Sequence, residues 1–384
     1  MIWQLFLLIP VACACLYWLM TSVCMAIFFL RKKKRCQVLS PEPGSFSPFV
    51  SLIKPVCGLE KNLYENLATA CLQNYPRFEV IYSVQNPADP ALKVLKEIRK
   101  NYPGVKMQIV IDEEAIGPNG RLANIYNASK HAEGEVLVFS DSDMFLKSDY
   151  LKTIVAPLGN KEIGVSCTLY KAWCADSFEE YLELLSFNAD FIPSVVFATV
   201  THASLACPGA SQAVRRDVLE QIGGLAPLAH FLVEDFELGR RAVEAGYKIH
   251  FSPYVAATGV DLKNFLGWWR HQVYWDQNTR AAAGVGFFFT LLIRGIPFAV
   301  LYAFSGGPDA KLVLTATVGV RLFTTWINSF FFLKDTQGLK AIGLLPIRDI
   351  LGFFVWFASF VKRKTVWKDR TFIIEKGKMV EVES

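Results

Sequence analysis

The chain carries little charge for its size. Of its 384 residues only 20% are charged and 52% are hydrophobic, and the mean hydropathy is +0.29. An ordinary soluble protein of this length is excluded, because part of so much apolar surface must face lipid. The net charge of +5 gathers beside the apolar segments. No nucleic-acid-binding motif accompanies it, so we expect a lipid bilayer as partner and no nucleic acid.

Several motifs are also missing. There is no G-x-x-x-x-G-K-[ST] loop and no G-x-G-x-x-G after the first expected strand, which excludes Walker-type NTPases and dinucleotide oxidoreductases. The nine cysteines form no C-x-x-C pair, and the five histidines have no triad or zinc spacing. We therefore interpret the cysteines as reduced and buried.

The first 30 residues contain no charged side chain and are followed at once by RKKKR. This stretch is long enough to cross about 30 Å of hydrocarbon, and its basic residues follow it, whereas those of a signal peptide precede it. We predict a transmembrane anchor at 1–30 and a basic juxtamembrane linker at 31–48. The positive-inside rule then places the following domain in the cytoplasm.

C-terminal membrane helices are expected over 281–361. Their apolar blocks lie at 284–305, 312–333 and 341–361, and each contains one arginine, namely Arg294, Arg321 and Arg348. Charges inside spans usually face a protein interior, so we expect a small bundle that pairs the arginines; a polar lipid headgroup site is the alternative.

The third of these blocks is expected not to cross the membrane. Pro346, Arg348 and Asp349 interrupt it, and a basic tail at 362–384 follows, which also favours the cytoplasmic side.

Between the linker and these blocks, residues 49–280 alternate between short apolar runs and helical patterns. The expected strands are FVSLIK, FEVIYSV, KMQIVI and EVLVFS, and the expected helices cover 60–73, 91–100 and 121–132. Such alternation predicts an α/β domain with a parallel sheet. Ligands bind such sheets at the carboxyl ends of the strands.

Acidic residues stand at two notable places in this domain. Asp141 and Asp143 follow the fourth expected strand, a spacing suited to holding a divalent cation against a diphosphate, although an ordinary turn also uses Asp-Ser-Asp. Asp235, in HFLVEDFELGRR, precedes an expected helix; it either caps that helix or acts as a general base.

Several short motifs follow one another in order: KPVCGLE, YPRFEVIYSVQNPADPA, GPNGRLANI, SDSD, RRDVLEQIGGL, VEDFELGRR and RHQVYW. In this order they resemble the membrane-bound ceramide glucosyltransferases of glycosyltransferase family 21 and their bacterial relatives that glycosylate hopanoids. The resemblance covers most of the chain, from SLIKPVCGLEKNL to TFII. It implies a GT-A-like nucleotide-sugar domain at 49–280.

The resemblance also implies roles for single residues. Asp235 matches the general base that takes the proton of the acceptor hydroxyl. Asp141 and Asp143 match the acidic pair that binds the nucleotide diphosphate together with Mg²⁺ or Mn²⁺. Further contacts to the nucleotide sugar are implied for Asn86, Arg121, Asn124, His271 and Trp275.

Two positions depart from the family's pattern. Asn86 stands where a Val-Gln-Asp run is usual, and Tyr274 replaces the arginine before Trp275 in (R/Q)-x-x-R-W. We expect Arg270 or Arg280 to supply the missing cation.

Together these features predict a membrane-bound inverting glycosyltransferase that moves a hexose, glucose first, from a UDP-sugar to a hydroxyl of a membrane lipid such as ceramide. Inversion is expected because no second carboxylate is placed as a nucleophile. The alternatives are a hopanoid (N-acetyl)glucosaminyl-type transferase, a processive polysaccharide synthase and a catalytically impaired sugar-nucleotide-binding protein.

We expect a multi-pass membrane protein with a cytoplasmic catalytic domain, in a bacterial inner membrane first and otherwise in a Golgi or ER membrane. Two segments are candidates for contact with lipid. Residues 177–200 read either as a buried core helix or as an interfacial helix, and residues 262–275 carry an aromatic belt beside cations.

Overall fold

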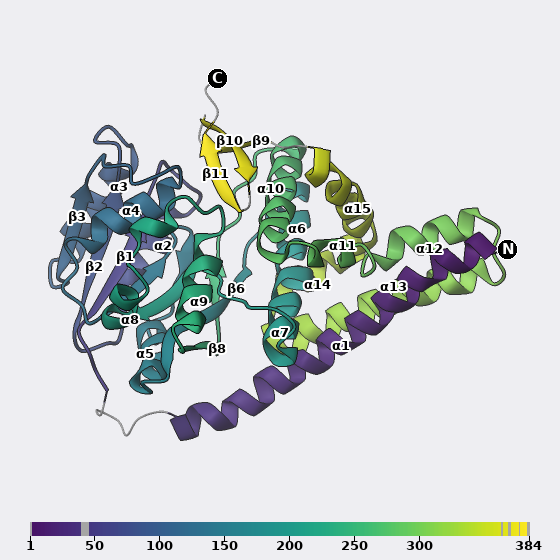
Figure 1. The fold of residues 1–384 in the computed structure, drawn as a ribbon, viewed down its shortest axis with the longest axis horizontal. Helices are drawn as coiled ribbons and strands as arrows, with labels where there is room; N and C mark the ends of the chain where they lie inside the picture. Colours follow the sequence, from purple (N-terminus) through teal and green to yellow (C-terminus); the bar gives the residue numbers. More distant parts are fainter. Residues whose placement is uncertain (1, 40–45, 362–363, 368–369, 376, 382–384) are drawn as a thin grey trace.

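A computed structural model describes residues 2–39, 46–361, 364–367, 370–375 and 377–381. It contains an α/β domain, a group of long helices and a small sheet near the C-terminus (Figure 1). The first helix, α1 (Ile2–Leu39), starts at the far end of the helical part and returns toward the α/β domain (Figure 1).

The α/β domain is built on an eight-stranded sheet with the order β3-β2-β1-β4-β7-β6-β8-β5. The strands are β1 (Val50–Pro55), β2 (Phe78–Val84), β3 (Met107–Ile111), β4 (Val136–Ser140), β5 (Met144–Phe145), β6 (Ile163–Ala172), β7 (Ser211–Arg215) and β8 (Lys248–Thr258). The first four strands pair in parallel, which confirms the expectation. Strand β7 runs antiparallel to β4 and β6, so the whole sheet is mixed.

Both faces of the sheet are covered. Leu52 and Val80 belong to one apolar cluster, whereas their neighbours Ile53 and Ile81 belong to another. Successive side chains of a strand point to opposite faces, so a strand buried on both sides reads as a continuous apolar run. These strands can therefore be recognised in the sequence as continuous apolar runs.

Short helices connect the strands. They are α2 (Leu63–Ala68), η1 (Thr69–Leu72), α3 (Ala91–Asn101), α4 (Gly120–Ser129), α5 (Tyr150–Val155), η2 (Ala156–Gly159), α8 (Arg216–Gln221), η4 (Ala226–Leu228) and α9 (Glu234–Glu244). The three helices expected from the sequence are present as α2 with η1, as α3 and as α4, so these predictions are confirmed.

Four helices among the described residues are long and apolar enough to cross a membrane, judged by length and composition: Gln4–Leu30, Phe178–Thr201, Ala310–Leu333 and Thr336–Val361. Their parts are α1, then α6 (Phe178–Leu185), η3 (Ser186–Phe191) and α7 (Ile192–Thr201), then α13 (Ala310–Ile327) and η5 (Asn328–Leu333), and finally α14 (Thr336–Ala341), η6 (Ile342–Leu344) and α15 (Leu345–Val361). Between them lie α10 (Phe265–Ala283), α11 (Gly286–Phe289) and α12 (Gly295–Phe304).

The lengths of the C-terminal helices correct one expectation. The block at 284–305 breaks into two short helices, of which the longer, α12, has only 10 residues. The block at 341–361, expected to be too interrupted, is part of a helical stretch of 26 residues, Thr336–Val361. It tolerates Arg348 and Asp349 because both side chains are buried and ion-paired.

The arginines of the helical part are paired, as expected. Arg321 donates to Asp349 at 2.8 Å and to Asp190 at 2.5 Å, and Arg348 donates to the same two carboxylates. Separately, Arg294 donates to Asp276 at 3.2 Å. The bundle interpretation is therefore confirmed.

The C-terminal segment forms a small antiparallel sheet where only a basic tail was expected. Its strands are β9 (Lys364–Trp367), β10 (Arg370–Glu375) and β11 (Lys378–Glu381). In Figure 1 this sheet (yellow) lies between the α/β domain and α10.

Candidate active site

Four acidic side chains and one arginine come together where β4 ends. The turn after β4 supplies Asp141 and Asp143, and the first turn of α9 supplies Glu234 and Asp235. The arginine is Arg121, in the first turn of α4. Asn119 fixes the start of α4, because its side-chain oxygen accepts a hydrogen bond from the Leu122 N–H at 3.0 Å.

Arg121 joins the separate elements of this site. Its Nε donates to Asp141 Oδ1 at 2.6 Å, its Nη1 to Glu234 Oε1 at 2.6 Å and its Nη2 to the Gly209 carbonyl at 2.7 Å. The side chain is only 19% exposed. A guanidinium offers such donors in a rigid planar fork, so one residue holds the turn after β4 and the start of α9 in register.

Asp235 is held by backbone groups. Its Oδ2 accepts from the Gly209 N–H at 2.5 Å and its Oδ1 accepts from the Phe236 N–H at 2.7 Å. A Cβ atom on Gly209 would lie 2.8 Å from Asp235 Oδ2, so only glycine fits there. The N-cap position of α9 is occupied by Val233, and Asp235 lies inside the first turn, so the interpretation of Asp235 as a plain helix cap is wrong.

Burial and the neighbouring Glu234 carboxylate raise the pKa of Asp235 to about 7. A carboxyl group with this pKa is half ionised near neutral pH and can take up a proton there.

Asp143 has a buried oxygen without a donor. Its Oδ2 accepts from Thr258 Oγ1 at 2.9 Å, whereas its Oδ1 is buried and has no hydrogen-bond partner. Burial and the charges of Asp141 and Glu60 raise the pKa of Asp143 to about 7. Buried polar atoms are normally satisfied, and a hard cation binds to carboxylate oxygens, so this atom suits a divalent metal.

Asp141 and Asp143 alone do not make a complete metal site. Among the residues that the structure describes, no group of three or more His, Cys, Asp or Glu side chains could hold a metal ion. A cation at Asp143 would therefore take further oxygen ligands from a bound substrate or from water.

Lys54, on β1, is a residue that sequence reasoning missed. Its fully buried ammonium donates to the carbonyls of Asp141 at 2.8 Å and Met144 at 3.1 Å, and so holds the turn that carries both acids. Burial lowers the pKa of Lys54 to about 8. The signal was a lysine at the end of the apolar run FVSLIK, where it is also the first residue of the motif KPVCGLE.

Two predicted ligands make other contacts. Asn86 is exposed, and its Oδ1 accepts from the Ala88 N–H within its own turn. Asn124 is buried, and its amide group joins Ser83 and the Val56 carbonyl at 3.5 Å each. Asn124 thus contacts the ends of β1 and β2, one turn along α4 from Arg121, whereas Asn86 contacts its own turn.

The last motif lies on α10, near enough to the acids for the charge of Asp143 to act on His271. His271 Nδ1 lies 2.9 Å from Glu183 Oε1, and Trp275 Nε1 donates to His271 Nε2 at 3.0 Å. Burial opposes the imidazolium, but Glu183 outweighs it and raises the pKa of His271. The Trp275 ring packs on Phe187. Glu183, on α6, gave no signal in the sequence because its partner lies 88 residues away.

The proposed substitutes for the missing arginine do not join the acids. Arg280 donates to the Ser359 carbonyl at 2.8 Å and lies over the Phe360 ring, so the expectation for it is wrong. Arg270 is exposed.

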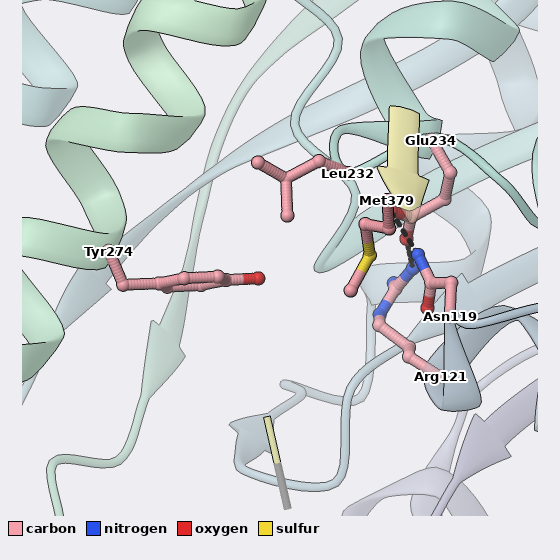
Figure 2. Close-up of a pocket in the computed structure, with 6 residues that line it drawn as sticks. All are labelled: Asn119, Arg121, Leu232, Glu234, Tyr274 and Met379. Carbon is pink, nitrogen blue, oxygen red and sulfur yellow. Dashed lines mark hydrogen bonds and ion pairs between the residues drawn. The ribbon is translucent and has the colours of Figure 1, made fainter. Parts of the chain in front are cut away.

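Tyr274 points from α10 toward the Arg121 side of the site (Figure 2). It borders a cavity of about 50 Å³, and the other lining residues are Asn119, Arg121, Leu232, Glu234 and Met379. The cavity thus has a polar floor, where Asn119 and Arg121 both donate to Glu234, and an apolar wall.

The chain is similar in sequence to a known family of glycosyltransferases. The profile of Glycosyl transferase family 21 matches residues 14–380. Ceramide glucosyltransferase 1 of Caenorhabditis elegans is 25% identical over 346 residues, which are 88% of this chain and 74% of the relative. Ceramide glucosyltransferase 3 of the same organism is 26% identical over 225 residues, 57% of this chain and 48% of the relative. The match therefore spans about half the length of that second relative.

Among solved structures, the mannosyltransferase PcManGT from Pyrobaculum calidifontis, in complex with GDP-Man and Mn²⁺, is similar to the chain with a TM-score of 0.51. It is 17% identical, and the match covers 86% of this chain and 99% of that one. At this identity the likeness speaks for the fold alone. The predicted fold class, a GT-A-like domain combined with apolar helices, is confirmed.

Proposed function

From the premise that the chain belongs to glycosyl transferase family 21, we propose that it moves a hexose, glucose first, from a UDP-sugar to a hydroxyl group of a membrane lipid such as ceramide. That it is a glycosyltransferase follows from the family. The observation that carries the proposed chemistry is the meeting of Asp141 and Asp235 beside Arg121, with Asp143 in the same turn as Asp141. The two ceramide glucosyltransferases among its relatives support glucose and ceramide as the first choices.

The donor diphosphate is assigned to the turn after β4. Arg121 lies there with charge-assisted donors that suit phosphate oxygens. Asp143, with its unpartnered Oδ1, and Asp141 would hold Mg²⁺ or Mn²⁺. When bound, such a cation neutralises the charge that builds up on the departing diphosphate. Lys54 holds the turn in place through its hydrogen bonds to the Asp141 and Met144 carbonyls.

Asp235 is assigned as the general base. The acceptor oxygen attacks C1 of the sugar, its proton passes to the Asp235 carboxylate, and the bond from C1 to the diphosphate oxygen breaks. One displacement at C1 inverts the anomeric centre. The N–H groups of Gly209 and Phe236 fix the direction in which the carboxylate points. Glu234, held by Arg121, orients the start of α9.

The helical part is assigned to the bilayer. Helices α1 and α13 expose large apolar side chains along their lengths, among them Leu5, Leu16, Leu312 and Phe323. In Figure 1, α6, α7 and α10 run at a steep angle to α1 and α13. If α1 and α13 cross the membrane, the other three lie along its cytoplasmic face, where a lipid hydroxyl reaches Asp235 without leaving the bilayer. A bacterial inner membrane is our first choice and a Golgi or ER membrane the second.

The test is transfer of radiolabel into extractable lipid by membranes that contain the chain. UDP-glucose, UDP-galactose and UDP-N-acetylglucosamine are offered as donors, with ceramide, diacylglycerol and a hopanoid polyol as acceptors. We expect product from UDP-glucose and ceramide, and none from Asp235→Asn. The matched control is Asp217→Asn, because Asp217 is an exposed acid in the first turn of α8.

Product from another pair with the same dependence on Asp235 would change the substrate but keep the enzyme class. Equal rates in wild type and Asp235→Asn would remove Asp235 from the mechanism. A soluble polymer product would favour a processive synthase.

A further inference from the structure

The C-terminal sheet is attached to the loop that leads to Asp235. The Met379 N–H donates to the His230 carbonyl at 2.8 Å, and the Leu232 N–H donates to the Gly377 carbonyl at 3.0 Å. Between these bonds, Phe231 and Lys378 form an antiparallel bridge. The loop thus pairs with the edge of β11 that β10 leaves free, as an added strand.

Side chains strengthen this attachment. Met379 and Leu232 are both buried and form one apolar cluster, and Tyr274 and Ala281 of α10 pack against it. Lys378 Nζ lies 5.4 Å from the centre of the Phe231 ring. The cluster therefore connects three segments that are far apart in sequence: the loop before α9, β11 and α10.

The attached loop ends where the catalytic helix begins. Leu232 is followed by Val233, the N-cap residue of α9, and then by Glu234 and Asp235. Met379, Leu232 and Glu234 also line the same cavity beside Arg121, and Figure 2 shows Met379 on its strand above that cavity. A shift of the loop would therefore move Asp235 relative to the turn that carries Asp141.

We propose that the C-terminal hairpin β10–β11 is part of the active site, with Met379 as a positioning residue that holds the loop 230–233 and thereby aims Asp235 at the acceptor. Met379 acts through the loop and does not touch the reacting atoms. The expected change in kcat rests on the proposed function, whereas the attachment of the loop to the hairpin does not. The donor turn after β4 is held by Lys54 and Arg121, so loss of Met379 affects the base and leaves donor binding intact.

The matched pair of variants is Met379→Ala and Val380→Ala. These neighbours point to opposite faces of β11, and their exposures are 6% and 46%. The full chain in lipid nanodiscs is assayed with UDP-glucose and ceramide, and amide hydrogen exchange is measured over residues 228–235 and over the eight-stranded sheet. We expect Met379→Ala to lower kcat about tenfold, because small displacements of a reacting group are costly. The KM for UDP-glucose should stay within about twofold, and Leu232 should exchange faster.

Val380→Ala and Met379→Leu, which keeps the bulk, should behave like the wild type. If Met379→Ala does not accumulate, Met379→Val provides the smaller truncation. Equal kcat and equal exchange at Leu232 in Met379→Ala and Val380→Ala would overturn the proposal. Faster exchange throughout the eight-stranded sheet would also overturn it, because Met379 would then contribute to the stability of the whole fold and not to the position of the loop. If the wild type transfers no sugar, the proposed function fails, whereas exchange at Leu232 still decides whether the hairpin holds the loop.

Discussion

Two clusters of buried charged side chains in this chain consist of the same residue types but differ in the balance of acids and cations. In the helical part, Arg321 and Arg348 face Asp190 and Asp349, two cations against two acids, and each arginine contacts both carboxylates. At the end of β4, Arg121 contacts Asp141 and Glu234, while Asp143 and Asp235 remain without a cation bonded to their side chains among the described residues.

The difference is in charge balance. The helical cluster is neutral and closed, as a buried ion network must be if it is to hold helices together. The cluster around Arg121 has surplus acid, an unpartnered oxygen on Asp143 and raised pKa values at Asp143 and Asp235. Surplus buried charge of this kind costs stability and marks a place where a ligand or a proton completes the balance.

The largest expected effect comes from a substitution in the cluster around Arg121, which we call the open cluster because its acids exceed its cations. Asp235→Asn should lower kcat on the order of 10³-fold, because a general base contributes roughly 10²–10⁴-fold. The substitution should not lower stability, since it removes a surplus charge. Transfer rates of the purified variant check the expected loss of kcat, and its thermal unfolding checks that stability is not lowered. A variant that loses activity only because it unfolds would contradict the assignment of Asp235 as the base.

The closed cluster should respond in the opposite way. Arg321→Met leaves Asp190 and Asp349 with one cation between them, so we expect a loss of about 3–5 kcal/mol of stability. Unfolding of the chain in micelles measures the loss. Lys248→Met, which breaks an exposed pair with Glu162, is the control and should cost at most about 1 kcal/mol. Similar losses in both variants would refute the distinction.

Lys54 offers a sharper comparison, because a second lysine is bonded in the same way elsewhere. Lys54→Met should weaken Mn²⁺ affinity about tenfold, as loss of groups that orient metal ligands does. Lys171 donates to the carbonyls of Leu333 and Lys334, away from the acids, so Lys171→Met should leave that affinity unchanged. Titration with Mn²⁺ in the presence of UDP distinguishes the two. Equal weakening would assign Lys54 to general stability.

The smallest effect is on pH dependence. With a pKa of about 7, Asp235 is protonated in acid, so kcat should fall about tenfold per unit below pH 7. Since this pKa lies above the usual 3.8, the folded chain holds more protons than the unfolded chain between about pH 4 and 7. The contribution of Asp235 to stability therefore grows as the pH falls through this range. A kcat that stays constant down to pH 5 would contradict the assignment.

What the sequence could predict depended on how local the signal was. The strands β1, β2 and β4 are buried runs and β3 is a partly buried one, with short helices between them, and they were found from their pattern. Asp141, Asp143, Arg121 and Asp235 could be proposed as site residues because they stand in ordered motifs. The pairing of β7 between β4 and β6, the attachment of β11 to the loop before α9 and the bond of Glu183 to His271 depend on contacts between distant segments, which no local pattern contains.

The prediction that the block at 341–361 is too interrupted for a long apolar helix was wrong for a related reason. The charges of Arg348 and Asp349 argued against a long apolar helix, and only the position of Asp190 and Arg321 beside them makes that helix stable. A charge inside an apolar block is thus interpreted correctly only together with its partner.

The most direct test of the open cluster is calorimetric titration of UDP into the wild type, Asp143→Asn and Asp235→Asn, with and without Mn²⁺. We predict binding by the wild type that requires Mn²⁺, unchanged binding by Asp235→Asn, and loss of binding by Asp143→Asn. UDP binding that needs no metal and survives in Asp143→Asn would contradict the assignment of the unpartnered oxygen, and with it the account of why this cluster carries surplus acid.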